Sequence, residues 1–506
     1  MPTRPPRTSA SAAVGAAVPP LLACGAVLVL CAYRAASQSI VHDEALTYNW
    51  FLVASTHAAD LDNHVLHTRL VGASVALFGL SELSMRLPAL LGTALYLFGC
   101  VRLVGRVVPD AWAVAGGVLL LAANPLVLDL LCLARGYSLA LGALVCALAW
   151  APSLAPPGAE TAPPGMARSR LRERWLTGLG VGLSISSNLA FAPPALSLWL
   201  LEALDTAFVP SGARRCHRLG LGVAPLVCAA ILGPSLVQAE TFHFESGHDS
   251  LFGLASDLLR GSFADPGSVF DLELEDRLRW AGVVGLVWIG LRGWRSAAAA
   301  ARPVAARRLG IGLLGMIGLS LGQFLVVHQL AGLRYPVDRT AIYLVTLLGL
   351  AALAGAAALP ARPGWLRALA GGCGAGVVSV YLLGLRVDHF RTWRYDAGAR
   401  AIFLALQADH EARASGRSAS VGGDWLFEPA LNFYRARYGS SWLEEYTRVE
   451  QPDPADYDYF VWGDAPSSPG LIGTTPIYRD PISGAAVFAR AGTTRLPDVS
   501  GAARSR

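Results

Sequence analysis

The feature that most constrains the fold of this chain is a series of apolar runs, each about as long as a bilayer is thick. A membrane-spanning helix needs about 20 predominantly apolar residues. Soluble domains carry about 25% charged residues, whereas this chain of 506 residues is 54% hydrophobic and 15% charged. We therefore predict a polytopic α-helical membrane protein with about eleven transmembrane helices, at residues 17–34, 84–101, 111–131, 137–153, 175–191, 193–208, 219–238, 279–292, 309–330, 340–360 and 366–386.

One further apolar stretch, residues 65–80, is short and carries His67 and Arg69. Arginine is enriched in short cytoplasmic loops. If 65–80 lies along the outer face without crossing, the inner loops hold about twice as many arginines as the outer loops before residue 388. This topology puts the N-terminus inside and brings the polar segments to one outer face: 42–70, 132–138, 239–278 and 331–339.

The chain changes character after residue 387. Residues 1–387 form the predicted transmembrane catalytic domain, with outer loops at 36–83 and 239–278. In the tail, "DAGARAIFLALQADHEARA" and "EPALNFYRARYG" are typical of helices, and "SASVGG", "DYDYFVW" and "TPIYRDPISGAAVFAR" of strands, the last a hairpin. We predict that residues 388–506 fold as a small extracytoplasmic α/β domain.

The segment "VHDEALTY" places two adjacent carboxylates, Asp43 and Glu44, directly after the first span. A lone acid at such a position is most often solvated and without function. Charged groups in or near a membrane are costly, however, and usually have a function. A carboxylate next to an acceptor hydroxyl can take its proton as a general base. The pair is therefore either surface charge or part of an active site at the outer leaflet.

Four segments within the first 150 residues or so resemble, in the same order, segments of a known protein class. They are "HDEALTYNW", "NHVLHTRL", "FGLSELSMRLPALLGTALYLFG" and "LARGYSLALGAL". Together they resemble the GT-C class of membrane glycosyltransferases, in particular the branch with protein O-mannosyltransferases (glycosyltransferase family 39) and lipid A aminoarabinose transferases. "LRYPVDRTAIYL" resembles the Arg-Tyr segment before a later span of this class. The resemblance implies transfer of a sugar from a polyprenyl-phosphate carrier to an extracytoplasmic acceptor, with inversion at the sugar.

The resemblance also implies roles for three residues. Asp43 matches the acid that is the proposed base of the class. Glu44 would position the acceptor or tune Asp43, since two adjacent acids in a poorly hydrated site do not both ionise freely. His64 falls where the class often has a His-Pro-Pro motif, but this chain has "NHVL" without the prolines. We expect His64 to bind substrate.

Two segments supply arginines at outer span ends. Arg135 in "ARGYS" either anchors the span end at the headgroups or binds the carrier phosphate, whose geometry a guanidinium group matches. In "GLRYPVDRT", Arg334 and Arg339 either pair with Asp338 or stabilise the leaving phosphate. The side chains that we expect to bind substrate in these segments are Arg135, Tyr137, Arg334, Tyr335 and Arg339.

The outer loop "TFHFESGHDSL" carries His243, Glu245 and His248. We expect this loop to cover the donor or the acceptor. A divalent ion at the loop stays open as an alternative, although the spacing matches no closed zinc signature. The eight cysteines also lack the paired spacing of a metal site or a disulfide framework. We therefore predict no metal ligands and no certain cofactor.

These residues and the topology predict an inverting glycosyltransferase of a bacterial cell membrane, with its active site and C-terminal domain on the extracytoplasmic side. The expected partners are a polyprenyl-phosphate-linked sugar, membrane lipid and a glycan, lipid or protein acceptor. The alternative, a transporter or flippase of a lipid-linked glycan, predicts mid-membrane ionisable groups and two related halves. The ionisable groups of this chain gather at one face instead. Nucleic-acid binding is excluded, because the arginines are spread over short loops rather than one basic surface.

Overall fold

The computed structural model describes most of the chain, and all structural statements concern the described residues: 10–54, 60, 63–155, 164–208, 211–238, 247–263, 301–359, 364–413, 417–463 and 473–490. The predicted span at 279–292 lies outside them. The chain divides into two compact units. The first comprises Met1–Tyr33, Ala59–Val71 and Arg86–Leu385, and the second comprises Arg34–Ala58, Gly72–Met85 and Arg386–Arg506.

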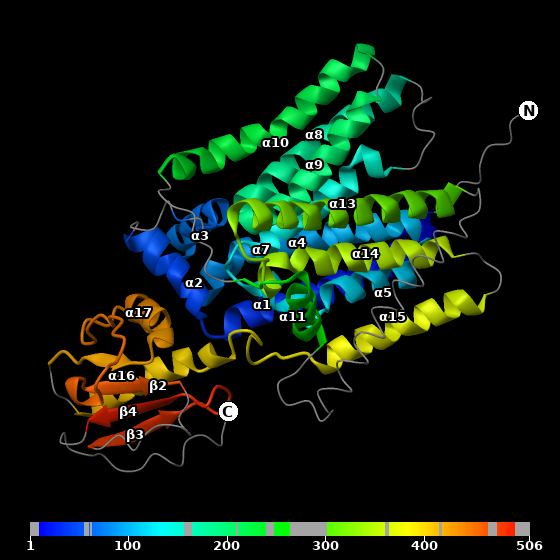
Figure 1. The fold of residues 1–506 in the computed structure, drawn as a ribbon. Coiled ribbons are helices and arrows are strands. Elements are labelled where there is room, and N and C mark those ends of the chain that lie inside the picture. The colour runs from blue at the N-terminus through cyan, green and yellow to red at the C-terminus, as the bar shows by residue number, and fades with distance from the viewer. Residues whose placement is uncertain are drawn as a thin grey trace, which may run out of the picture. The chain divides into compact units, whose positions relative to one another are not determined.

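The first unit is built from helices (Figure 1), and three of them, α1, α3 and α4, extend into the second unit. The helices are α1 (Ala10–Ser37), α3 (Val65–Phe78), α4 (Glu82–Val107), α5 (Ala111–Ala122), α6 (Pro125–Cys132), α7 (Tyr137–Trp150), α8 (Pro164–Ser187), α9 (Ala192–Ala207), α10 (Ser211–Gln238), α11 (Leu251–Phe263), α13 (Ala301–Ala331), α14 (Ile342–Ala358) and α15 (Trp365–Leu383), with short 3₁₀ turns η2 (Pro152–Leu154), η4 (Leu189–Phe191) and η5 (Asp338–Ala341). Small residues bring these helices together. A Cβ on Gly142 of α7 would lie 2.4 Å from the carbonyl oxygen of Gly92 in α4. The Ser184 hydroxyl of α8 donates to the carbonyl oxygen of Ala140 in α7 over 2.9 Å. Both kinds of contact are typical of packing between membrane helices.

Six helical segments of the described chain are long and apolar enough to cross a membrane: Ala17–Ser37, Glu82–Val107, His217–Ser235, Val304–Ala331, Asp338–Ala358 and Trp365–Leu383. Helices α5 and α6 make a seventh if they count as one span, bent by 77°. The bend falls inside the predicted run 111–131 because the Asn124 side chain caps α6. Its oxygen accepts from the backbone N–H groups of Leu126 (3.1 Å) and Val127 (3.2 Å), and Pro125 begins the helix.

The structure is thus mostly helical with several candidate spans, and the number of eleven spans and their orientation stay predictions. Helix α3 forms within 65–80, the stretch predicted to lie on the outer face. It has 14 residues and is shorter than the candidate spans. Helix α7, at the predicted span 137–153, is equally short. Helices α8 and α9, at the predicted spans 175–191 and 193–208, are also not among the candidate spans of the described residues.

The second unit contains a four-stranded sheet with the strand order β1-β2-β4-β3 (Figure 1). β1 and β2 are parallel, whereas β4 is antiparallel to both β2 and β3. The small C-terminal α/β fold is therefore confirmed, and its place outside the membrane stays a prediction. The elements of the unit are α2 (His42–Leu46), the π-helix η1 (Thr47–Ala54), η6 (Arg394–Asp396), α16 (Ala399–Arg413), β1 (Val421–Gly423), η7 (Trp425–Phe427), α17 (Glu428–Arg437), η8 (Pro454–Asp456), β2 (Tyr459–Trp462), β3 (Thr474–Arg479) and β4 (Ala486–Arg490).

The second unit is larger than the predicted tail domain. Its C-terminal segment begins at Arg386, within two residues of the predicted boundary, and the unit also includes residues 34–58 and 72–85. The sequence assigns both segments to outer loops of the transmembrane domain. The first of them carries the acid pair, so the packing of this segment against the tail decides the surroundings of Asp43.

Candidate functional site

The acid pair lies in the first turn of α2, and its two carboxylates have different surroundings. Glu44 is fully buried, and its Oε2 accepts a hydrogen bond of 3.1 Å from the backbone N–H of Val41, the residue before the helix. Asp43 is partly exposed, and its carbonyl oxygen accepts from the Thr47 hydroxyl over 3.2 Å. Glu44 therefore stabilises the start of the helix, whereas Asp43 is partly exposed as a residue, with its Oδ2 buried.

Residues of the tail hold the backbone and side chains around the pair. The backbone N–H of His42 donates to Asp396 Oδ2 over 2.6 Å, and His42 Nδ1 lies 2.8 Å from the carbonyl oxygen of Leu426. A carbonyl oxygen only accepts, so Nδ1 carries the proton of the neutral ring. The Asn49 amide donates to the carbonyl oxygen of Pro429 over 2.9 Å. These contacts tie α2 and η1 to residues more than 350 positions further along the chain.

Asp396 is a fully buried acid close to the pair. Burial raises the pKa of Asp396 well above its ordinary value, and the hydrogen bond from His42 opposes this rise in part. The negative charges of Asp43, Glu44 and Asp424 raise it further. Its Oδ1 is buried and has no hydrogen-bond partner among the described residues. Asp396 therefore keeps its proton to a higher pH than an ordinary aspartic acid.

The guanidinium of Arg448 and the indole ring of Trp425 lie next to His42. The Arg448 guanidinium lies 5.4 Å from the ring centroid of Trp50 and 4.9 Å from that of Trp425, and its Nε is 2.9 Å from Glu428 Oε2. The ring of Trp425 meets the His42 ring edge to face at 5.5 Å. Cation–π contacts hold the guanidinium in place, and the half-exposed Trp425 lies beside the acid segment.

In the first unit, predicted residues meet in a buried polar group, termed the His64 cluster: His64, His67, Arg135, Tyr137 and Asn188. The rings of His64 and Tyr137 meet edge to face with centroids 5.7 Å apart. The amide nitrogen of Asn188 lies 3.4 Å from His64 Nε2 and 3.4 Å from the carbonyl oxygen of Arg135. The start of α3, the turn before α7 and the residue before η4 thus converge, and the common outer face predicted for 42–70 and 132–138 stays a prediction.

The turn that carries Arg135 is pressed against both histidines. Gly136 has a φ of 73°, a conformation that glycine adopts without strain. A Cβ at this position would lie 2.3 Å from the carbonyl oxygen of Ser187, 3.2 Å from Cβ of His64 and 3.3 Å from Cβ of His67. The glycine of "ARGYS" therefore allows α7 to begin in contact with the two imidazoles.

The histidines of this cluster are neutral, and three of their four ring nitrogens have no hydrogen-bond partner among the described residues. His67 is fully buried, and neither of its ring nitrogens has a partner among the described residues, nor has Nδ1 of His64. Burial first and the charge of Arg135 second lower the pKa of both rings, to about 3 for His67. Arg339 adds to the effect on His64. A neutral imidazole has one N–H donor, so the cluster combines cationic charge with buried donors and is suited to a phosphate.

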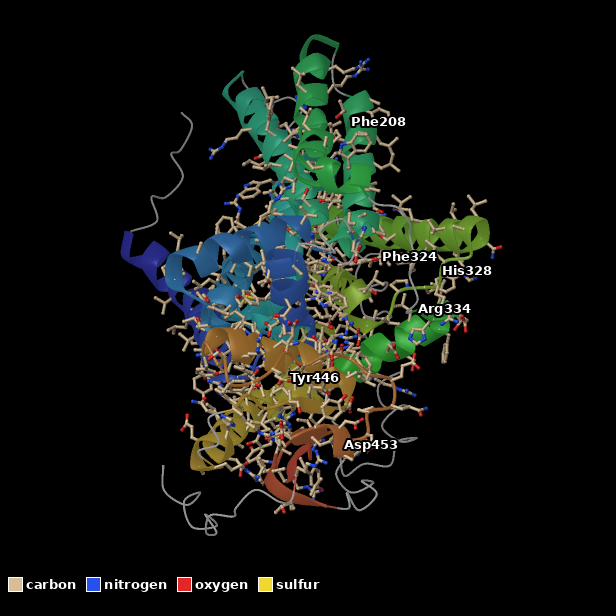
Figure 2. All side chains as sticks on the ribbon, turned by 90° about the vertical axis from the view of Figure 1, so that its left-hand side faces the viewer. Phe208, Phe324, His328, Arg334, Tyr446 and Asp453 are labelled. Atoms are coloured by element: carbon tan, nitrogen blue, oxygen red, sulfur yellow. The ribbon has the colours of Figure 1, made fainter. Side chains whose placement is uncertain are left out.

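The other predicted residues form a separate group around Tyr335. The backbones of His248 and Tyr335 exchange two hydrogen bonds of 2.8 Å, and the Tyr335 ring stacks on His328 with centroids 4.6 Å apart. Arg334 is half-exposed, and its Nε lies 3.5 Å from Asp249 Oδ1. Figure 2 shows Arg334 close to His328 at the end of α13. Of the two arginines of "GLRYPVDRT", Arg339 is therefore the one whose charge acts on the His64 cluster.

The predicted loop of His243, Glu245 and His248 is described only at His248. Its ring nitrogen Nε2 bonds to Asp257 Oδ2 of α11. His243 and Glu245 lie outside the described residues. Within the described ranges, no group of three or more His, Cys, Asp or Glu side chains is arranged to hold a metal ion.

Three residues of these sites were not predicted as site residues from the sequence: His67, Asn188 and Asp396. His67 stands in the segment "NHVLHTRL", three residues after His64, so its spacing from His64 at the start of α3 was a usable signal. Asn188 and Asp396 come from distant parts of the chain with no motif around them. Their contribution becomes visible only in the folded chain.

Comparison with known proteins gives likeness in structure but not in sequence. No protein-family model and no curated protein matches the sequence. The crystal structure of ArnT from Cupriavidus metallidurans in the apo state is similar with a TM-score of 0.56 at 16% identity, covering 96% of this chain and 100% of that one. ArnT from Cupriavidus metallidurans bound to undecaprenyl phosphate gives a TM-score of 0.54 at 17% identity, covering 97% and 100%. The likeness confirms the expected GT-C fold.

Proposed function

We propose that this protein is an inverting glycosyltransferase that moves a sugar from a polyprenyl-phosphate carrier to an acceptor hydroxyl. The observation that carries the proposal is the His64 cluster, in which the buried Arg135 lies beside two neutral imidazoles with unsatisfied nitrogens. The shared fold with ArnT, which was crystallised with undecaprenyl phosphate, supports a polyprenyl phosphate as the ligand.

The His64 cluster would stabilise the leaving group. As the bond between the anomeric carbon and the phosphate oxygen breaks, both electrons of the bond stay on that oxygen. Arg135 and Arg339 supply positive charge for the growing negative charge, and His64 and His67 supply N–H donors. Groups fixed before the reaction in a buried site stabilise such charge more strongly than water does.

Asp43 would act as the general base. It takes the proton of the acceptor hydroxyl, whose oxygen attacks the anomeric carbon opposite the leaving phosphate, and one such displacement inverts the configuration. The partial exposure of Asp43 supports this role. Glu44 is engaged at Val41 N, so we assign it to holding α2 and thereby Asp43 rather than to binding the acceptor.

We place the site and the C-terminal unit on the extracytoplasmic face of a bacterial cell membrane. The support is the arginine distribution, which puts the arginine-rich short loops inside. The acceptor is then a hydroxyl of a glycan, lipid or protein at that face, and no nucleic acid is involved.

The test is donor consumption by the full-length protein in lipid vesicles, with a panel of polyprenyl-phosphate sugars and release of polyprenyl phosphate as the signal. We expect Asp43→Asn to abolish turnover and Asp456→Asn, an exposed acid of the same unit, to leave it unchanged. Full turnover in Asp43→Asn would refute the assignment of the base. A wild-type protein that consumes no donor of the panel would refute the whole proposal, whereas movement of intact donor across the vesicle would indicate the flippase.

A further inference from the structure

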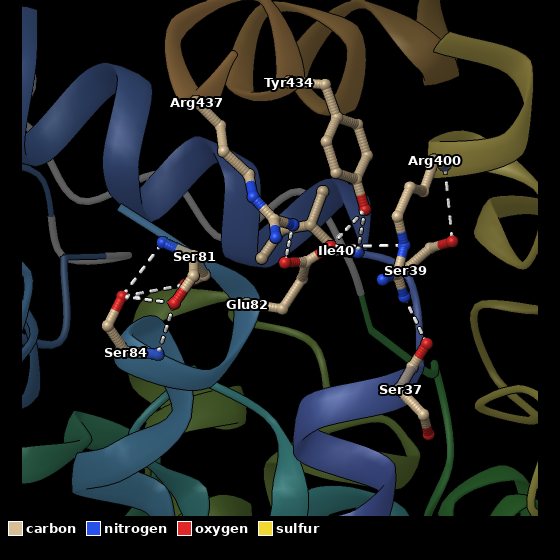
Figure 3. A network of polar contacts seen from close by, with 9 residues as sticks. All are labelled: Ser37, Ser39, Ile40, Ser81, Glu82, Ser84, Arg400, Tyr434 and Arg437. Atoms are coloured by element: carbon tan, nitrogen blue, oxygen red, sulfur yellow. Dashed lines mark hydrogen bonds and ion pairs between the residues drawn. The ribbon is translucent and has the colours of Figure 1, made fainter. Parts of the chain in front are cut away.

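The hydroxyl of Tyr434 joins two segments of the second unit that are distant in sequence. It accepts a hydrogen bond of 2.9 Å from the backbone N–H of Ile40 and donates one of 3.0 Å to Glu82 Oε1 (Figure 3). Tyr434 and Ile40 are both fully buried, so neither bond is exposed to water. Ile40 lies three residues before Asp43, and Tyr434 lies on α17 of the tail.

The partner of the hydroxyl, Glu82, is itself held firmly. Its carboxylate is buried and is paired with Arg437 of α17 and with Arg400 of α16, whose Nε lies 3.4 Å from Oε1 (Figure 3). Charge-assisted hydrogen bonds of this kind are stronger than hydrogen bonds between neutral groups. Because the Tyr434 hydroxyl donates to a fixed anion, its lone pair is directed at the N–H of Ile40 and cannot turn away.

The bond at Ile40 is one of several anchors directly before the acid pair. The Ser39 hydroxyl donates to the carbonyl oxygen of Ala397 over 2.8 Å, and the backbone N–H of His42 donates to Asp396 over 2.6 Å. In the free chain these groups would bond to water. In the protein, Ile40 and His42 have buried N–H groups whose partners are both side chains of the tail, and a buried N–H needs a partner.

We propose that Tyr434 is a positioning residue for Asp43, and that the tail takes part in the reaction by fixing the backbone on which this acid stands. The proposal rests on the proposed role of Asp43 as the base. A displacement of about 1 Å in a reacting group costs roughly 100-fold in rate, so release of Ile40 is enough to slow proton transfer. Binding of the donor phosphate depends on other residues and is unaffected.

The experiment compares Tyr434→Phe with Tyr459→Phe in the full-length protein in lipid vesicles. Tyr459 is a matched control, because it is a buried tyrosine of the same unit whose hydroxyl donates to Asp409 of α16 over 2.9 Å. We expect kcat of Tyr434→Phe to fall by roughly 10- to 100-fold, with KM for the donor unchanged. We also expect faster hydrogen exchange at the Ile40 amide, unchanged exchange at the His42 amide, and wild-type values for Tyr459→Phe.

Three results would overturn the proposal. They are a kcat of Tyr434→Phe equal to that of Tyr459→Phe, a raised donor KM with kcat unchanged, and a lowered kcat without faster exchange at Ile40. Melting temperatures of the two variants are measured in parallel. If a general loss of stability explained the lowered kcat, this result would also contradict the positioning role of Tyr434. If Asp43→Asn is inactive and Tyr434→Phe behaves as the control, only the positioning role fails; if Asp43→Asn is fully active, the proposed base fails first.

Discussion

Replacing His67 with leucine is expected to stabilise the ligand-free protein. His67 is fully buried, and both of its ring nitrogens lack a partner among the described residues. A buried polar group without a hydrogen bond costs about 1–3 kcal/mol. Leucine is of similar size and has no polar atom to satisfy. We therefore expect the free energy of unfolding to rise by about 1–2 kcal/mol at pH 7.

The same change is expected to weaken binding of the carrier. In the complex that we propose, a phosphate oxygen accepts the N–H of His67, and a hydrogen bond to a charged group contributes about 1.5–3 kcal/mol. Since about 1.4 kcal/mol corresponds to a factor of ten, Kd for undecaprenyl phosphate should rise by roughly 10- to 100-fold. One substitution thus raises stability and lowers affinity, which is typical of a residue kept for function.

The pKa of His67 gives the prediction a pH dependence. A histidine of the unfolded chain titrates at about 6.5, whereas the native ring titrates at about 3. Between these values the unfolded chain binds a proton that the native protein does not, so stability falls as the pH is lowered. From neutral pH to pH 5 this group accounts for a loss of about 2 kcal/mol. His67→Leu removes the loss, so its advantage over the wild type should grow at pH 5.

The measurements are denaturant unfolding in detergent at pH 7 and pH 5 and titration with undecaprenyl phosphate. Arg69→Leu, at an exposed position of the same helix α3, is the control and should leave Kd unchanged. A His67→Leu protein that is less stable than the wild type at pH 7 and binds the lipid equally well would refute the reasoning. His67 would then be a packing residue whose nitrogens need no ligand.

Three further predictions concern the other residues of the two units. Arg135→Gln should raise Kd for undecaprenyl phosphate at least tenfold, since it removes a charge beside the phosphate, whereas Arg69→Gln should not change the titration. Glu44→Gln keeps an oxygen for the N–H of Val41 and should retain turnover within about twofold, whereas Glu44→Ala loses this bond at a cost of about 1 kcal/mol and should lower both melting temperature and turnover. Because the native pKa of Asp396 is raised, the wild type loses stability as the pH rises above the unfolded value of about 3.9; Asp396→Asn should therefore gain stability relative to the wild type between pH 4 and pH 8 in denaturant unfolding.

Local patterns in the sequence predict the elements of the tail well. The segments read as helices contain α16 and α17, and the hairpin read from "TPIYRDPISGAAVFAR" is formed by β3 and β4. Periodicity and turn residues decide such elements, and both are visible over a few residues. The run at 111–131 shows the limit of this reasoning, because Asn124 and Pro125 inside an apolar run begin a new helix where hydropathy alone indicates one span.

The candidate site could be predicted in part for a different reason. Ionisable residues are rare in an apolar chain, so His64 and Arg135 stand out, and the structure brings them together. Asn188 and Asp396, which complete the two groups of polar residues, are not marked by the sequence around them. Asn188 reaches His64 from 124 positions away, and Asp396 reaches His42 from 354 positions away. No local pattern contains a contact over such a distance.

The length of α2 explains why the acid pair belongs to the unit of the tail. Its five residues are far below the about 12–15 that an isolated helix needs to be even marginally stable. The order of this segment therefore comes from tertiary contacts. Within the second unit those contacts come from Asp396, Leu426 and Tyr434. A motif such as "VHDEALTY" can thus indicate Asp43 as the candidate base, but the fold of the last part of the chain determines where its carboxylate is held.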